Sequence, residues 1–88
     1  MHAIITVSGA DHTGIIAAVT TALADLDANV LDVTQTLMSG YFTMVLRVSY
    51  PDKVTISDLK DKMRGVAEKL EQTIHVQSEA LFTAMNEV

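Results

Sequence analysis

The residues best suited to binding a small ligand lie in one stretch, SGADHTGIIAAV, at residues 8–19. Amide groups at a helix N-terminus carry partial positive charge and bind anions, and Gly14 has no side chain to crowd them. Asp11 can accept a hydrogen bond from an ammonium group. A carboxylate acceptor beside an amide-lined anion site suits one small zwitterion, an α-amino acid.

The same residues also permit a purely structural interpretation. Asp11 or Thr13 would then cap the helix, and Gly14 would let the helix pack close to a strand. If Gly14 instead lies in the first helical turn with ordinary helical dihedrals, a glycine there serves only to admit a ligand. In that case we expect Gly14→Ala to keep or raise stability and to weaken amino-acid binding. If Gly14 is needed for a positive φ or for close packing on a strand, the same change should destabilise the protein by more than about 1 kcal/mol. Spacing alone leaves these interpretations open.

Residues that commonly carry catalysis or bind metals are few and scattered. The sequence has no cysteine, no G-x-S-x-G nucleophile elbow and no phosphate-binding loop. His12 is the only basic side chain of the opening loop, where an acylphosphatase-like hydrolase would need an arginine, and no nucleophile is evident beside it. His2 and His75 would share a sheet face on neighbouring strands, but a third metal ligand is not evident. We therefore expect no enzyme activity, no metal site and no cofactor.

Composition narrows the class of protein further. The 88-residue chain has 6 Lys and Arg against 11 Asp and Glu, a net charge of −5, so direct nucleic-acid binding is not expected. The first residues lack a signal-peptide pattern, and no apolar run is long enough to cross a bilayer. We expect a cytoplasmic protein without membrane contact. Hydrophobic residues are 49% of the chain, and a small core buries them incompletely, which favours a homodimer.

Hydrophobic patterning predicts the elements that flank the loop. Residues 3–8 are apolar on both faces, which is typical of a central strand. After the loop, apolar residues recur at spacings of three and four, which predicts one buried helix stripe: Ile15, Ile16, Val19, Ala22, Leu23 and Leu26. Asn29 follows this helix, and we expect it in the left-handed conformation just past the helix end.

The second half of the chain predicts a hairpin, a helix and a last strand. Residues 30–50 hold two strands joined by a turn at residues 39–40. In the second strand, alternate residues are expected to face the core: Phe42, Met44, Leu46 and Val48. A helix begins near Thr55, which with Asp58 resembles a capping box. Residues 73–78 predict the last strand, and residues 79–88 a terminal helical turn.

The element order is therefore βαββαβ over a single domain, residues 1–88. With right-handed β-α-β connections, this order predicts an α+β ferredoxin-like sandwich, in which a four-stranded antiparallel sheet carries both helices on one face. The other sheet face, or an edge strand, is then left to meet water or a partner.

The segment DHTGII after the first strand, followed by ANVLDV at the second, resembles the ACT domain, a regulatory module of amino-acid metabolism. The usual pattern is Asp–x–Pro–Gly followed by two aliphatic residues, and then Gly–x–Asn. Two residues depart from it: Thr13 stands where proline is common, and Ala28 stands where glycine is common before the asparagine. The whole chain is similar to small stand-alone ACT proteins and to the ACT halves of the glycine cleavage system transcriptional repressor.

This resemblance implies an amino-acid site between two copies of the chain. The family's ligand-lining positions fall in the loop before the first helix and, opposite it, at the start of the second strand: Asp11, His12, Thr13, Gly14, Ile15, Asn29 and Val30. A helix C-cap is the alternative role for Asn29. The resemblance predicts a regulatory module that acts through a partner protein. The alternative is a ligand-free adaptor in which the ACT fold serves only protein interaction.

Overall fold

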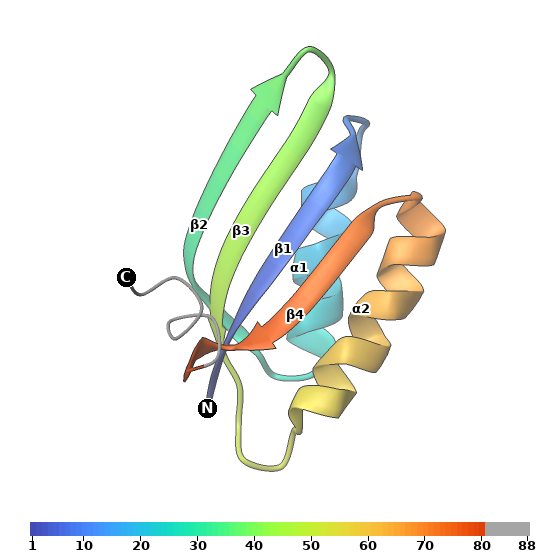
Figure 1. The fold of residues 1–88 in the computed structure, drawn as a ribbon. Helices are drawn as coiled ribbons and strands as arrows, with labels where there is room; N and C mark the ends of the chain where they lie inside the picture. Colours follow the sequence, from blue (N-terminus) through green and yellow to red (C-terminus); the bar gives the residue numbers. More distant parts are fainter. Residues whose placement is uncertain (81–88) are drawn as a thin grey trace.

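The computed structural model describes residues 1–80, and its elements follow in the expected β-α-β-β-α-β order (Figure 1). They are β1 (His2–Ala10), α1 (Ile15–Asp25), β2 (Asn29–Met38), β3 (Tyr41–Ser49), α2 (Ile56–Leu70) and β4 (Thr73–Ser78). The strands form one sheet in the order β2-β3-β1-β4, and every neighbouring pair is antiparallel. Both helices cover one face (Figure 1). The ferredoxin-like prediction is confirmed. Of the helical turn expected at residues 79–88, residues 81–88 lie outside the described part.

The core lies between the sheet and the two helices. In β3 the alternation is as predicted, because Phe42, Met44, Leu46 and Val48 are buried and the residues between them are not. β1 is central and supplies three fully buried side chains, Ala3, Ile5 and Val7. The helices add large core residues from one stripe each: Ile15, Val19 and Leu23 from α1, and Leu59 and Met63 from α2. The prediction that Ile16 belongs to the buried stripe is wrong, because its side chain is 45% exposed.

The start of α2 and the end of α1 test the predicted helix caps. At the start of α2 the predicted capping box is present: the Asp58 N–H donates to Thr55 Oγ1 (3.1 Å), and the Thr55 N–H donates to Asp58 Oδ2 (2.9 Å). At the end of α1 the left-handed residue is Asp27, with φ of 57°. Asn29 already belongs to β2. Both predictions for Asn29, a left-handed residue and a helix C-cap, are therefore wrong, because the helix closes before reaching it.

The edge strand β2 is the least covered part of the sheet. Nine of its ten residues are exposed, because both helices lie behind β1 and β4 (Figure 1). Large apolar side chains gather along it and at the adjoining start of β3: Leu31, Val33, Leu37, Met38 and Tyr41, which are 39–70% exposed. We call these five residues the β2 surface. Within residues 1–80, no helix is long and apolar enough to cross a membrane.

Candidate functional site

The loop at residues 11–14 joins β1 to α1 and is exposed throughout. The Asp11 N–H donates to the carbonyl oxygen of Gly40 (2.9 Å), which fixes the loop beside the β2–β3 hairpin. Gly14 is the N-cap residue of α1, and within residues 1–80 this helix start has no side-chain cap hydrogen bond. The prediction that Asp11 or Thr13 caps the helix is therefore wrong. The unpaired first-turn N–H groups remain open to an anion.

Gly14 owes its identity to its backbone conformation. Its φ is +93° and its ψ is 0°, a left-handed conformation that precedes the helix. A Cβ built at Gly14 meets no atom within 4 Å, so neither close packing on a strand nor an ordinary helical conformation explains the glycine. The expectations of ordinary helical dihedrals and of close packing on a strand are wrong, whereas the alternative of a positive φ is confirmed, and that φ is what requires glycine.

We expect Gly14→Ala to destabilise the protein by about 1–2 kcal/mol, because alanine is strained at a positive φ. Chemical denaturation measures the change. Gly14→Asn is the matched control, since asparagine tolerates the left-handed region better, and it should cost less than alanine. An alanine variant as stable as the original protein would contradict this assignment.

Five of the predicted site residues come together around the loop. A shallow hollow of about 320 Å³ is lined by residues 11–17 and by Phe42. An adjoining hollow of about 390 Å³ is lined by Asp11, Ile16, Phe42 and three residues of β2, Gln35, Thr36 and Leu37. The combined site offers a carboxylate, open helix amides and an apolar wall, which are the groups that a small amino acid requires.

Asn29 and Val30 lie at the opposite end of the sheet. Asn29 pairs with Ser49, whereas Met38 pairs with Tyr41 beside the loop. Met38 is nine residue steps along the strand from Asn29, which is about 30 Å at roughly 3.3 Å per residue. Within one chain, the structure therefore does not bring Asn29 and Val30 to the other five site residues.

Two long-range contacts hold the loop against the C-terminal end of α2. The ring of His12 places Nε2 2.9 Å from the carbonyl oxygen of Leu70 and Nδ1 3.1 Å from that of Thr13. Two residues after Leu70, the side chain of Gln72 donates from Nε2 to the carbonyl oxygen of Ala10 (2.8 Å). Gln72 is only 8% exposed. A glutamine after a helix carries no local signal of burial, so the contact of Gln72 with the end of β1 was not predicted from the sequence.

The protonation of His12 follows from these contacts. Carbonyl oxygens only accept, so a neutral imidazole can donate to one of them and the imidazolium to both. The hydrogen bond to Leu70, followed by that to Thr13, raises the pKa of His12 above its ordinary value, and the charges of Asp11 and Glu71 act in the same direction.

A raised pKa in the folded state fixes the sign of the pH dependence. The stabilisation by His12 is fully present below its unfolded pKa of about 6.5 and is lost as pH rises through the folded pKa. We expect amides of the loop to exchange progressively faster as pH rises above the unfolded pKa of about 6.5, after correction for intrinsic rates. Hydrogen exchange measures this, with His12→Gln as the control that should remove the extra pH dependence. Equal pH dependence in both proteins would contradict the assignment.

The other two histidines are not direct neighbours on the sheet. His75 is opposite Thr6 in the β1–β4 register, so it lies four residues along the sheet from His2. His2 instead lies near Glu79, with 3.8 Å between Nδ1 and Oε2. Among residues 1–80 no group of three or more His, Cys, Asp or Glu side chains is placed to hold a metal ion.

Comparison with known proteins agrees with the fold and the motif. The family model of the ACT domain matches residues 1–77. A UPF0237 protein from Corynebacterium efficiens is 52% identical over 89 residues, which is 100% of both chains. The solved ACT domain protein from Streptococcus pneumoniae is 39% identical, with a TM-score of 0.83 over 93% of each chain. A candidate glycine cleavage system transcriptional repressor is similar in fold, at 18% identity and a TM-score of 0.77 over 86% of this chain and 44% of its own.

Proposed function

Since this chain belongs to the ACT-domain family, we propose that it is a non-enzymatic regulatory module, which binds an amino acid or a similar small zwitterion between two copies and acts through a partner protein. One observation carries the proposal: the uncapped start of α1 and the hairpin end of the β2 surface form adjoining hollows that share Asp11, Ile16 and Phe42.

A two-fold pairing of β2 with β2 of a second copy explains why the two hollows lie beside the exposed edge strand. β2 is regular from Asp32 to Met38, after a bulge between Val30 and Asp32. Antiparallel pairing centred near Gln35 sets Val33 opposite Leu37 of the partner subunit, so the exposed apolar side chains bury one another. It also extends the sheet through an edge whose hydrogen-bonding groups would otherwise face water.

The same pairing completes the site. In this pairing, Asn29 and Val30 of the partner subunit lie beyond the last residue of β2 in the first copy, near its hairpin residue Gly40. Gly40 accepts the hydrogen bond of the Asp11 N–H. The site then combines the loop of one copy with the strand start of the other, which supports a ligand that binds only the dimer.

The ligand's two charged groups have distinct places in this arrangement. Its carboxylate would accept hydrogen bonds from the open first-turn amides of α1. Its ammonium group would donate to Asp11. Asn29 of the partner subunit offers a donor and an acceptor to the same groups. Ile16 and Phe42 leave an apolar wall for the ligand's side chain.

A thermal-shift screen of the twenty amino acids tests this function. A ligand at about 100 times its Kd stabilises the native state by about 2.7 kcal/mol, which raises Tm by several degrees in a domain of this size. We expect such a rise for one amino acid or one chemical class. No rise with any of them, in a protein that is dimeric by light scattering, would overturn the amino-acid proposal.

The alternative function is a ligand-free interaction adaptor. It is favoured by one observation: within a single chain the two hollows are shallow, and Asn29 lies at the far end of β2. An adaptor predicts the same dimer with no response to amino acids, so the screen separates the two functions.

A further inference from the structure

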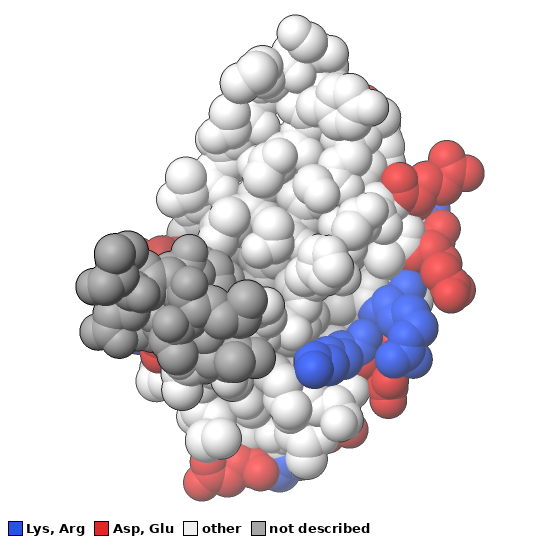
Figure 2. Space-filling view, in the orientation of Figure 1, with Lys and Arg blue, Asp and Glu red and all other residues white. Residues whose placement is uncertain are grey.

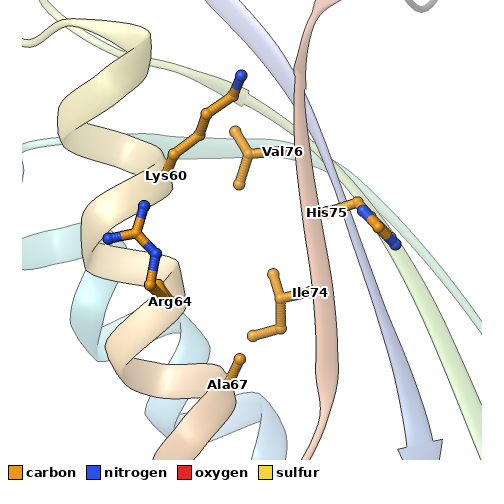
Figure 3. Close-up of a pocket in the computed structure, with 6 residues that line it drawn as sticks. All are labelled: Lys60, Arg64, Ala67, Ile74, His75 and Val76. Carbon is orange, nitrogen blue, oxygen red and sulfur yellow. The ribbon is translucent and has the colours of Figure 1, made fainter.

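The groove between α2 and β4 has features that the proposed function does not use. A hollow of about 340 Å³ lies between them, lined by Lys60, Arg64, Ala67, Ile74, His75 and Val76. Figure 3 shows Lys60 and Arg64 rising from α2 along the groove, while Ile74 and Val76 point from β4 toward the helix and His75 points away. The groove therefore has an apolar floor between the helix and the strand and a cationic wall on the helix side.

β4 is the second edge strand of the sheet. It pairs with β1 on one side, and no other strand within residues 1–80 pairs with it. Edge strands present backbone N–H and C=O groups that pair readily with an incoming strand. α2 runs antiparallel to β4 beside this edge (Figure 1), so a strand added to β4 would lie along the groove.

The charges in the groove are of one sign, although the whole chain is acidic. Within residues 1–80 Lys60 has no ion-pair partner, whereas Arg64 pairs with Asp61, with 3.0 Å between Nη1 and Oδ1. Figure 2 shows blue side chains on the α2 side of the molecule, with red side chains above and below them and a largely uncharged sheet face beside them. An unpaired cation at an open strand edge favours an anionic occupant.

The spacing of the two cations matches that of an extended chain. Lys60 and Arg64 are four residues apart on a helix, which is about 6 Å along its axis. Alternate residues of a strand lie on one face about 6.6–6.8 Å apart. We propose that an extended acidic segment of a partner protein, with Asp or Glu at alternate positions, adds to the outer edge of β4 over residues 74–76, which border the groove, and sets these carboxylates against Lys60 and Arg64.

A second copy of the chain fits this edge poorly. Pairing β4 with β4 of a second copy would bring two pairs of Lys60 and Arg64 together, and like charges at a contact are destabilising. The proposal is also independent of the proposed amino-acid site, because the groove lies at the opposite edge of the sheet from β2.

The test uses a capped peptide, Thr-Glu-Val-Glu-Thr-Glu-Val-Glu, titrated into the ¹⁵N-labelled full chain to about 5 mM, a range suited to weak binding. We expect amide shifts in β4 and α2, and affinity that falls as salt screens the cations. Lys60→Ala combined with Arg64→Ala should weaken binding about five- to tenfold. Lys69→Ala, which removes a cation from α2 outside the groove, should leave it unchanged.

Two further peptides separate strand addition from simple charge attraction. In each peptide, alternate residues are N-methylated. The two peptides carry the methyl groups on opposite edges of the extended chain, so each peptide loses hydrogen bonding along one edge only. We expect one of the two to lose binding and the other to keep it. Equal binding of both, equal binding by the Lys60/Arg64 double variant, shifts confined to β2, or no shifts at the highest concentration would each overturn the proposal. None of these outcomes depends on the amino-acid screen.

Discussion

Replacing Val33 and Leu37 together by glutamate should convert the proposed β2-paired dimer into a monomer, with a dimer Kd at least about a hundredfold higher. These side chains are 54% and 61% exposed in the single chain, and in the proposed pairing they contact each other across the two-fold axis. Glutamate at both positions would place four carboxylates in that contact, where burying unpaired charge is strongly unfavourable. Sedimentation velocity over a concentration series measures the change.

The control for this variant carries the same added charge at another exposed place. Thr21→Glu with Ala24→Glu changes two exposed residues of α1, away from β2, and should leave the dimer intact. Circular dichroism of both double variants should match the unmodified protein. A β2 variant that stays dimeric, or a control that dissociates equally, would show that the copies do not pair through β2.

Gly9→Ala should lower the free energy of unfolding by about 2–3 kcal/mol, the largest expected effect of a single methyl group in this chain. Gly9 has a φ of +154°, and a Cβ there would lie 2.5 Å from Oε1 and 2.8 Å from Cδ of the buried Gln72. Overpacking of this kind costs about 1–3 kcal/mol. Moving the amide away would also break its hydrogen bond to Ala10, worth about 1 kcal/mol. Urea denaturation followed by circular dichroism measures the loss.

Gly65→Ala is the matched control for that measurement. Gly65 lies inside α2, and a Cβ there meets no atom within 4 Å. Alanine favours a helix over glycine by up to about 1 kcal/mol, so this variant should gain stability. A Gly9→Ala protein that is as stable as the Gly65→Ala protein would show that Gln72 does not occupy a fixed place under the loop.

Local signals in the sequence were sufficient to predict the strands of the sheet and the ends of most helices and strands. The alternation that buries Phe42 and Met44 depends only on the two-residue period of a strand, and Thr55 and Asp58 are close enough in sequence for their cap to be recognised. Local signals did not predict the conformation of Asn29. The left-handed position depends on the residue at which the last helical turn closes, and that residue was Asp27 rather than Asn29.

The candidate loop was found in the sequence, but its geometry was not. A glycine near a helix start fits both a helical conformation and a positive φ, and only the structure distinguishes them at Gly14. The partners of His12 and Gln72 lie 58 and 62 residues away along the chain. Contacts at that separation follow from the packing of α2 against the sheet, which patterning alone does not place at the level of single atoms.

The central claim is that each ligand site is shared between two copies, and complementation of two variants tests it most directly. Asp11→Ala and Asn29→Ala proteins should each bind the amino acid found in the screen roughly ten- to a hundredfold more weakly, because a hydrogen bond to a charged group is lost. Both residues are exposed, so both variants should stay folded. A dimer that contains one chain of each variant has one site with both residues intact and one site with neither.

Isothermal titration calorimetry of an equal mixture of the two variants, after subunit exchange, is therefore the deciding measurement. With random exchange, half of the dimers are mixed and each has one intact site. We expect about a quarter of the sites in the mixture to bind with the affinity of the original protein. A mixture that binds as weakly as its two components would contradict a site shared between copies.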